Sequence, residues 1–266
     1  MNISSKVYNS VELWHRETSL PSIPTFSQSL DKIIGNEGVQ LCTLTELLGL
    51  PGSGKTQICI QLCASVQIPK SLGGLDAEAL YIDTNTHFTP YRFKDIVTAS
   101  LKKCQMVLNC PIVTSEEDVL KRLHYVNAFG IEKFCAFMHT LSRFVDEHPN
   151  IRLIVIDSIA FPYKEGISAG QRTGLLFRQM AELQRLAMEK QIAVVLTNEM
   201  STRVGLSTGS VVGSLGDAWA HRCNKRVLLS VINNSCERLA LSLKSNNAPN
   251  NVGRFKITQE GIRDVE

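Results

Sequence analysis

The amino-acid sequence predicts an α/β protein with a mostly parallel sheet, helices on its faces and an antiparallel extension at the C-terminal end. Three observations support this prediction. Short continuous apolar runs alternate with longer amphipathic segments between residues 41 and 197, a glycine-rich turn joins the first run to the first helix, and three short strands follow residue 225. Continuous apolar strands separated by helices are typical of a parallel sheet that is covered on both faces.

The first 22 residues differ from the rest of the chain because they are mostly polar. Pro21 and Pro24 mark the end of this segment, and Ser10–Glu17 is a candidate short helix within it. A length of 266 residues allows one large domain or two small ones. Because the remaining sequence contains neither an internal repeat nor a low-complexity tract, we predict an N-terminal arm over residues 1–22 and one core over residues 23–266.

The core elements follow from hydrophobic periodicity. Apolar runs bounded by turns predict buried strands, whereas apolar residues at every third or fourth position predict helices, as in Ile131–Glu147. The predicted parallel strands are Leu41–Leu48, Ala79–Asp83, Ile151–Asp157 and Ile192–Thr197. The predicted helices begin at Lys55 or cover Tyr91–Leu108, Ile131–Glu147 and Gln171–Lys190, and the antiparallel strands are Arg226–Val231, Arg238–Leu243 and Phe255–Thr258.

Composition and charge exclude several classes of protein. With 44% hydrophobic residues the chain can bury a core, which excludes intrinsic disorder. Apolar stretches such as Leu153–Ile156 are far shorter than the roughly 18 residues of a membrane span, so no membrane partner is expected. Residues 1–170 hold 15 Lys and Arg against 17 Asp and Glu, and residues 171–266 hold 13 against 8. Any contact with a polyanion is therefore expected in the C-terminal third.

The cysteines indicate a reducing compartment rather than a disulfide or zinc framework. The chain has 8 cysteines, but no C-x-x-C pair and no Cys/His quartet at zinc spacing. The N-terminal residues lack the hydrophobic segment of a signal peptide. We therefore expect free thiols inside the cell.

The strongest chemical signal is a G-x-x-x-x-G-K-T motif that follows the first predicted strand and opens the first predicted helix. Its residues are Gly49, Leu50, Pro51, Gly52, Ser53, Gly54, Lys55 and Thr56. Small residues let backbone N–H groups surround phosphate oxygens, and a helix N-terminus adds partial positive charge. Lys55 would reach the β- and γ-phosphates, and the Thr56 hydroxyl would hold Mg²⁺. The motif predicts a P-loop for ATP and Mg²⁺, with an ordinary glycine-rich turn as the alternative.

A P-loop requires an acidic residue near the magnesium ion, and Asp157 at the end of a buried apolar strand meets this requirement. Hydrolysis also requires a group that positions the attacking water. Asp83 ends the neighbouring predicted strand and His87 follows it, and both are candidates for that role. The alternatives are a capping residue at the strand end for Asp83 and a surface histidine for His87.

Beyond the P-loop, a series of short segments follows in order along the chain. They are Val66–Pro69, Gly73–Ala79, Tyr81–Thr84, Val155–Pro162, Leu196–Thr202 and Ser214–His221, which read VQIP, GGLDAEA, YIDT, VIDSIAFP, LTNEMST and SLGDAWAH. Through these segments residues 20–266 resemble the RecA-like strand-exchange recombinases of eukaryotes, above all their C-type paralogue, a DNA-repair accessory factor. The resemblance implies a RecA-like P-loop ATPase core in a nuclear protein. It also implies homologous-recombination repair, meiotic breaks included, and a heteromeric complex with other recombinase paralogues that assists the main recombinase. Full-length relatives carry a small helical domain before the core, which we expect to be absent here.

Carried over by position, the resemblance places Arg92 against the adenine, where a guanidinium can stack; a solvated residue at a helix start is the alternative. Two positions depart from the family pattern. Asn85 replaces the glutamate that activates water, and an amide can orient a water but cannot accept its proton. Glu199 replaces the glutamine that senses the γ-phosphate, and a carboxylate repels phosphate unless it is protonated or paired with metal. Lys55 and Asp157 keep their catalytic roles, and we expect ATP binding with weak or absent hydrolysis.

The resemblance also implies two DNA-binding loops at the carboxyl ends of the strands. The first, Phe161–Arg172, contains Lys164 and Arg172, and the second, Met200–Gly216, contains Arg203 among glycines and hydroxyl residues. Such groups suit the phosphate backbone of single-stranded or branched DNA, although mobile surface loops are the alternative. Three further basic residues either extend this surface or begin a strand: Arg222, Lys225 and Arg226.

The arm is a candidate contact with a neighbouring subunit, because the linkers of relatives add a strand and an anchor residue to the next protomer. Trp14 and Phe26 are candidate anchors, with packing against the chain's own core as the alternative. For the whole chain, an active P-loop motor ATPase and a small-molecule kinase are alternative functions. A purely structural subunit in which ATP holds a complex together is a third.

Overall fold

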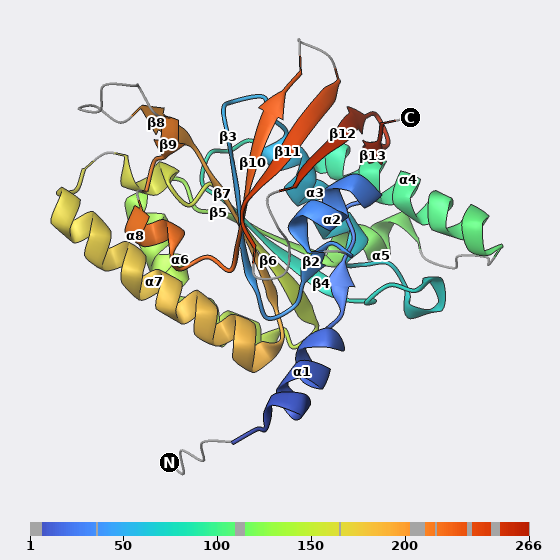
Figure 1. Ribbon diagram of the computed structural model, residues 1–266, viewed down its shortest axis with the longest axis horizontal. Helices are drawn as coiled ribbons and strands as arrows, with labels where there is room; N and C mark the ends of the chain where they lie inside the picture. Colours follow the sequence, from blue (N-terminus) through green and yellow to red (C-terminus); the bar gives the residue numbers. More distant parts are fainter. Residues whose placement is uncertain are drawn as a thin grey trace.

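The computed structural model describes residues 7–35, 37–109, 115–164, 166–202, 211–215, 217–232, 236–245 and 251–265. Within these residues nine strands form one central sheet (Figure 1). In order across the sheet they are β13 (Gly261–Asp264), β12 (Val252–Thr258), β11 (Glu237–Lys244), β10 (Lys225–Val231), β3 (Leu44–Gly49), β7 (Ala193–Asn198), β6 (Ile151–Asp157), β4 (Glu78–Asp83) and β5 (Leu123–Asn127).

The sheet divides into a parallel and an antiparallel part, as predicted from the sequence. All neighbours from β10 to β5 are parallel. The pairs β10–β11, β11–β12 and β12–β13 are antiparallel. The parallel strands are buried on both faces, because Leu153 and Val155 of β6 belong to one apolar cluster whereas Ile154 and Ile156 belong to the other. This confirms an α/β fold with an antiparallel C-terminal extension.

Helices cover both faces of the sheet, and Figure 1 shows α6 and α7 on one side and α2, α3 and α4 on the other. Their apolar residues complete the two clusters, in which α6 contributes Phe134 and Leu141 to the face opposite α3. The helices of the described residues are α1 (Ser10–Thr18), α2 (Gln28–Ile34), α3 (Lys55–Ser65), α4 (Pro90–Leu108), α5 (Glu116–Lys121), α6 (Ile131–Glu147), α7 (Ala169–Lys190) and α8 (Asp217–Ala220), with the 3₁₀ turns η1 (Lys70–Leu72) and η2 (Phe161–Tyr163).

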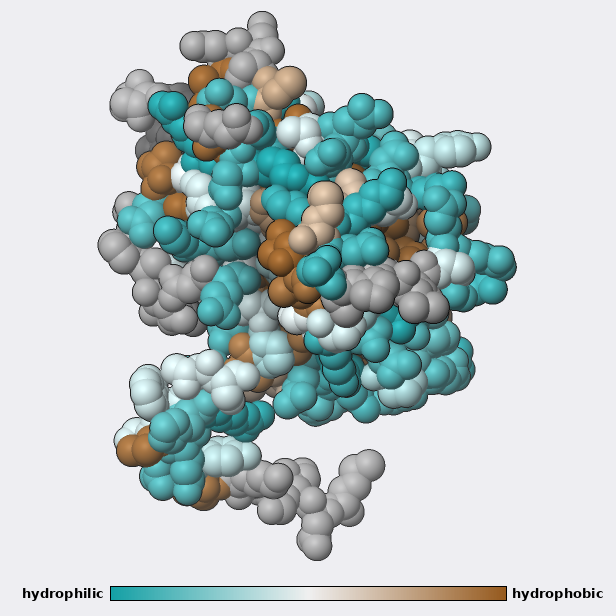
Figure 2. Space-filling model, turned by 90° about the vertical axis from the view of Figure 1, so that its right-hand side faces the viewer, coloured by the Kyte–Doolittle hydropathy of each residue, from teal (hydrophilic) through white to brown (hydrophobic). Residues whose placement is uncertain are grey.

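The N-terminal arm contains a helix, α1, that stands apart from the core, as Figure 2 shows in space-filling form. No residue of α1, all of which the structure describes, is buried, and Trp14 is 61% exposed. The chain joins the core through the antiparallel pair β1 (Ser22–Ile23) and β2 (Val39–Gln40). Phe26 is half-buried, with the charged groups of Lys103 and Arg263 within 6 Å of its ring centroid. Its packing within the chain agrees with the core alternative for this residue, whereas Trp14 remains a candidate anchor.

Two of the segments predicted from the sequence differ in the structure. The apolar run Leu41–Leu48 is not one strand, because the chain turns at Cys42, whose φ is +64°, so that β3 begins at Leu44. The segment predicted as a second loop, Met200–Gly216, contains two short strands. These are β8 (Met200–Thr202) and β9 (Val211–Gly213), which pair with each other. Neither difference moves the carboxyl ends of the parallel strands, where the candidate site lies.

Candidate nucleotide-binding site

The P-loop connects β3 to α3 through a turn that glycine favours. Gly52 and Gly54 have φ angles of +80° and +100°, which side-chain-bearing residues rarely adopt. A Cβ atom on Gly54 would also lie 2.7 Å from Ile257 Cδ1 of β12. Gly54 is the N-cap of α3 and has no side chain to bond the first backbone N–H groups of the helix. Those N–H groups remain suited to an anion at the helix N-terminus.

Lys55 curls back onto this loop. Its Nζ atom donates to the carbonyl oxygens of Gly49 at 2.8 Å and Leu50 at 3.1 Å. Burial lowers the pKa of Lys55, and the negative charges of Asp157 and Glu199 act in the opposite direction. The ammonium group is therefore held within the loop, where phosphate oxygens would meet it.

Asp157 at the end of β6 accepts hydrogen bonds from three hydroxyl groups. Its Oδ2 atom accepts from Thr56 Oγ1 and from Tyr81 OH, both at 2.7 Å, and its Oδ1 atom accepts from Thr197 Oγ1 at 2.5 Å. Burial and the nearby Asp157 charge raise the pKa of Tyr81 well above its usual range, so the phenol stays a donor. The structure thus brings the predicted pair Thr56 and Asp157 together.

Tyr81 and Thr197 were not predicted from the sequence as site residues. Both are strand residues near the carboxyl ends of β4 and β7, the two neighbours of β6. Polar hydroxyl groups in otherwise apolar strands were the available signal, because a buried hydroxyl group needs a hydrogen-bond partner. The partner itself becomes visible only when the strand order is known.

The segment after β4 separates the candidates for water activation. Asp83 is buried and accepts from the backbone N–H groups of Asn85 and Phe88, each at 3.0 Å, and from Tyr125 OH at 3.2 Å. These contacts match the capping alternative for Asp83, and His87 is exposed. The Asn85 Oδ1 atom is buried and has no hydrogen-bond partner among the described residues. Asn85 therefore offers an unused acceptor at the position where the resemblance expects a base.

The end of β7 carries Glu199 beside the P-loop. Asn198 is paired with Leu48 of β3, so Glu199 follows at the level of Gly49. Its carboxylate Oε2 lies 2.5 Å from Lys164 Nζ. We expected a carboxylate here to need a proton or a metal beside phosphate, and the structure instead provides an ammonium group.

A buried network holds the strand end that carries Glu199. Asn198 donates from Nδ2 to Glu46 Oε1 at 2.7 Å and accepts at Oδ1 from Ser214 Oγ at 2.7 Å. Glu46 of β3 also accepts from Trp219 Nε1 at 2.8 Å and from Arg226 Nε at 2.5 Å. The network therefore joins the nucleotide side of the sheet to the segments that flank the second predicted loop.

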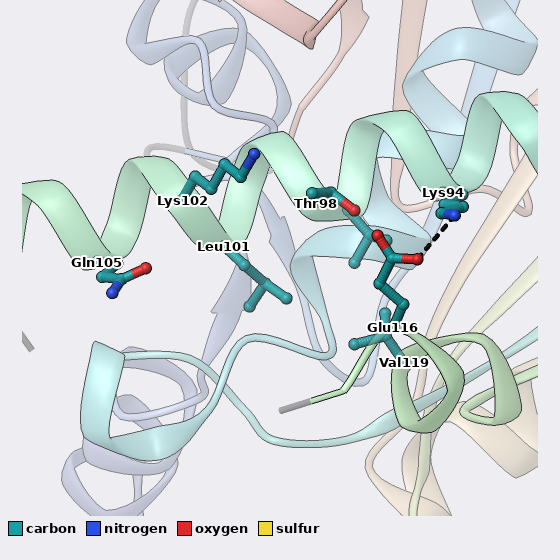
Figure 3. A pocket seen from close by; sticks show the side chains of 8 residues that line it. Lys94, Thr98, Leu101, Lys102, Gln105, Glu116 and Val119 are labelled. Carbon is teal, nitrogen blue, oxygen red and sulfur yellow. Dashed lines mark ion pairs between the residues drawn. The ribbon is translucent and has the colours of Figure 1, made fainter. Parts of the chain in front are cut away.

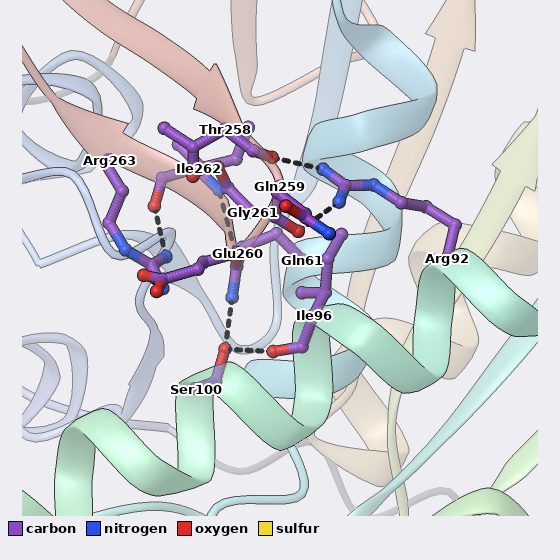
Figure 4. A network of polar contacts seen from close by, with 10 residues as sticks. All are labelled: Gln61, Arg92, Ile96, Ser100, Thr258, Gln259, Glu260, Gly261, Ile262 and Arg263. Carbon is purple, nitrogen blue, oxygen red and sulfur yellow. Dashed lines mark hydrogen bonds and ion pairs between the residues drawn. The ribbon is translucent and has the colours of Figure 1, made fainter.

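Arg92 and Arg238 approach the same region from other elements. Figure 4 shows Arg92 of α4 reaching the turn between β12 and β13, where it donates to the carbonyl oxygens of Thr258 and Gln259. Its Nε atom donates to Gln57 at 2.7 Å, so adenine stacking remains a prediction for Arg92. Arg238 of β11 donates from Nε to the Gly52 carbonyl oxygen at 3.2 Å, and sequence reasoning did not find this contact.

The predicted DNA residues are not grouped together by the described structure. Lys164 pairs with Glu199, Arg172 is half-buried in the first turn of α7, and Arg203 lies outside the described residues. Of the further basic residues, Lys225 and Arg226 begin β10, where Lys225 is buried and Arg226 pairs with Glu46. Arg222 precedes the strand and lies over the Phe177 ring at 4.4 Å. DNA binding by Lys164, Arg172 and Arg203 therefore remains a prediction.

The residues present fit ATP with Mg²⁺. Gly54 leaves the α3 N-terminus without a side-chain cap, Lys55 supplies a cation, and the Thr56 hydroxyl donates to the Asp157 carboxylate. The Ser53 hydroxyl is buried and has no hydrogen-bond partner within the described ranges. Oxygen ligands from one hydroxyl and one carboxylate are those that Mg²⁺ takes together with phosphate oxygens.

A separate pocket between α4 and α5, bridged by the 2.7 Å ion pair of Lys94 and Glu116, shares no residue with this site (Figure 3).

The fold and the site together define a P-loop nucleotide-binding protein of the RecA-like class. More particularly, the chain belongs to the Rad51 family, whose family model matches residues 16–265. It is 30% identical to "DNA repair protein RAD51 homolog 3" of Cricetulus griseus over 99% of this chain and 74% of that protein. For the protein of the same name from Dictyostelium discoideum the identity is 29%, over 92% of this chain and 66% of the relative. "DNA repair and recombination protein RadA" of Aeropyrum pernix is 31% identical over 93% of this chain and 75% of its own length.

These relatives confirm the family resemblance and connect the chain with proteins of DNA repair and recombination. Of the helices formed by the described residues, none has both the length and the apolar character that crossing a membrane requires.

Proposed function

We propose that this protein is an ATP-binding recombinase paralogue that acts in homologous-recombination repair of DNA double-strand breaks, including meiotic breaks, in the nucleus. The observation that carries the proposal is the contact between Thr56 and Asp157 beside the P-loop, in a chain of the Rad51 family. The names of the relatives, which refer to DNA repair and recombination, support the biological setting.

In this proposal the P-loop N–H groups and Lys55 bind the phosphates of ATP, and Thr56 and Asp157 hold Mg²⁺. The metal ion supplies charge neutralisation at the phosphates. Asp157 orients the Thr56 hydroxyl, and its contacts with Tyr81 and Thr197 keep the carboxylate in place. Arg92 lies near α3 and is the proposed contact for the base.

Hydrolysis is proposed to be weak, because an amide stands at the position of the water-activating base and the nearby carboxylate of Asp83 is engaged in other contacts. Asn85 offers an amide oxygen that can orient a water molecule but has too low a basicity to take its proton. Asp83 is already engaged by two backbone N–H groups and by Tyr125. ATP would then act chiefly as a ligand that fixes the conformation of the subunit.

The working unit is proposed to be a heteromeric complex with other recombinase paralogues that binds single-stranded or branched DNA and assists the main recombinase. The arm helix α1 is exposed and carries Trp14 on its surface, which supports a contact between this helix and a neighbouring subunit. The excess of basic residues after residue 170 supports a DNA surface in that part, with Lys164, Arg172 and Arg203 as candidate contacts. Because the excess is modest, strong DNA binding is expected only in the complex.

ATP binding and ATP turnover of the purified protein, measured with and without single-stranded DNA, test the proposal. We expect wild type to bind ATP with Mg²⁺ and to turn it over near background, and Lys55→Ala to lose binding. The double variant Asn85→Glu and Glu199→Gln restores the residues that the family pattern expects. It should raise turnover at least about tenfold, since a positioned general base is worth that much or more.

Robust hydrolysis by wild type would favour the active motor ATPase instead, and phosphoryl transfer to a small molecule would favour a kinase. The kinase alternative has less support because no arginine-rich lid follows the P-loop in the sequence. If Lys55→Ala or Lys55→Arg leaves partner binding and repair intact, the nucleotide is dispensable, and neither the ATP-dependent function nor ATP as a purely structural ligand holds.

A further inference from the structure

An ion pair at the end of β7 joins two residues that the sequence assigns to different sites. Lys164, predicted to contact DNA, and Glu199, predicted to face the γ-phosphate, lie 2.5 Å apart, and their side chains are 46% and 30% exposed. The ammonium group also lies 5.1 Å from the centroid of the Phe161 ring. Two groups therefore fix its position, one on the segment after β6 and one on the end of β7.

Three observations place this pair beside the phosphate-binding loop. The pairing of Asn198 with Leu48 puts Glu199 at the level of Gly49, the first glycine of the loop. Thr197, two residues earlier, bonds to Asp157 at the proposed metal position. Glu199 also lies close enough to Lys55 of the loop for its charge to act on the Lys55 ammonium group.

Charge decides what the pair can do in this position. A lone carboxylate near the third phosphate of ATP would repel it, and the repulsion would be strong in a partly buried site. Lys164 cancels this repulsion, because its ammonium group is in direct contact with the carboxylate. An ammonium group has three N–H donors, so a bond to Glu199 leaves others for a phosphate oxygen.

We propose that Lys164 is a second cation of the nucleotide site, positioned by Glu199 beside the terminal phosphate of ATP, and that the pair sets the preference for ATP over ADP. The inference rests on the proposed function, because it takes ATP to be the ligand of the P-loop. Lys164 then neutralises the negative charge of Glu199, which stands where the family pattern has a neutral glutamine. Removing either partner changes the affinity for ATP more than that for ADP, since only ATP carries the third phosphate.

The test compares the dissociation constants of ATP and ADP, each with Mg²⁺, for wild type, Lys164→Met, Glu199→Gln and the double variant. Lys164→Met leaves the carboxylate uncompensated and should lower the affinity for ATP relative to ADP by about tenfold. Glu199→Gln frees the cation and should raise the same ratio by about threefold. The double variant should return to within about twofold of wild type, because the repulsion and its compensation disappear together.

Lys190→Met is the matched control. Lys190, the last residue of α7, forms an ion pair of the same length, 2.5 Å, with Asp146 of α6, and its side chain is 40% exposed. This variant should leave the ratio of the two affinities unchanged. The circular dichroism spectrum of each variant checks that the fold is retained.

Two results would overturn the inference. An unchanged ratio in both single variants would mean that the pair does not face the third phosphate. A loss of affinity for single-stranded DNA in Lys164→Met, with the ratio unchanged, would make Lys164 a DNA contact instead. If wild type binds neither nucleotide, the proposed function itself fails and the inference fails with it, whereas binding of both with an unchanged ratio leaves the proposed function standing.

Discussion

Asp157 gathers hydroxyl groups from three elements, and its two oxygens accept from Thr56, Tyr81 and Thr197. Each bond restricts the rotation of the carboxylate. A site that is oriented in advance loses less conformational entropy when it binds a ligand. The residues around Asp157 therefore support the metal position as much as the two residues that would touch the ion.

Asp31 is a second carboxylate whose surroundings set its behaviour. It is 8% exposed in α2 and accepts from Thr25 through the backbone N–H at 2.8 Å and the hydroxyl at 2.7 Å. Burial raises the pKa of Asp31 from 3.8 to about 6, against the effect of these hydrogen bonds and with a smaller contribution from the charge of Asp264. The folded chain thus binds a proton that the unfolded chain has already released between about pH 4 and pH 6.

We therefore predict that Asp31→Asn stabilises the protein at neutral pH but not at acidic pH. Stability of the wild type falls as pH rises through this window, because the folded state must give up a proton that it holds more tightly. The difference in unfolding free energy from Asp31→Asn should grow from near zero at pH 4 to about 2–3 kcal/mol at pH 7. Urea unfolding of both proteins at several pH values measures it, and a difference that does not change with pH would contradict the prediction.

At the scale of secondary structure, α1 and α2 are capped in different ways. The N-cap Asn9 and Glu12 of α1 bond each other's backbone N–H groups, so this cap lies within the helix. The N-cap of α2 is Ser27, whose hydroxyl accepts from the Leu30 N–H at 3.3 Å. The first turn of α2 also contacts Asp264 of β13, which accepts from Ser27 Oγ at 2.6 Å and from the N–H groups of Gln28 and Ser29. A residue near the C-terminus thus caps a helix near the N-terminus.

We predict that Asp264→Ala lowers the free energy of unfolding by about 1 kcal/mol, because α2 loses acceptors for its first N–H groups and a favourable charge at its N-terminus. Asn9→Ala is the matched control, since it removes a cap from a helix without buried residues and should change stability by less than about 0.5 kcal/mol. Denaturant unfolding compares the two. Equal effects would show that α1 and α2 contribute alike to the cooperative core.

For the whole molecule, Glu46 connects parts of the chain that are far apart in sequence. It is fully buried in β3, and its partners Asn198, Trp219 and Arg226 belong to β7, α8 and β10. A buried carboxylate with three donors is stable only while the donors remain. The network fixes the junction between the parallel part of the sheet and its antiparallel extension.

Glu46→Gln should therefore lower the free energy of unfolding by about 3 kcal/mol, because it leaves the guanidinium of Arg226 partly buried without its counter-charge. Adding Arg226→Met should restore part of this loss, since the unpaired charge is then removed. Arg185→Met breaks exposed ion pairs on α7 and should change stability by less than about 0.5 kcal/mol. Urea unfolding measures all three, and a Glu46→Gln protein as stable as wild type would contradict the role of the network.

Prediction from sequence succeeded where one physical pattern dominated a segment. The strand Ile151–Asp157 and the helix Ile131–Glu147 have the predicted bounds, because the first is mostly apolar and the second repeats apolar residues at helical spacing. β5 was not predicted, because it is the edge strand of the sheet and none of its five residues is fully buried, so it lacks a continuous apolar run. β13 was missed because four residues are too few for a periodic signal.

The sequence by itself determined the α/β fold, the P-loop from Gly49 to Thr56 and the acidic strand end at Asp157, since each depends on residue types at fixed spacing. Only the tertiary structure decided which side chains meet at that strand end and which cation forms an ion pair with Glu199. Lys164 and Glu199 lie far apart in sequence, and only the strand order places them together. Partners brought together by folding leave no periodic trace in the chain, because their distance depends on every element that packs between them.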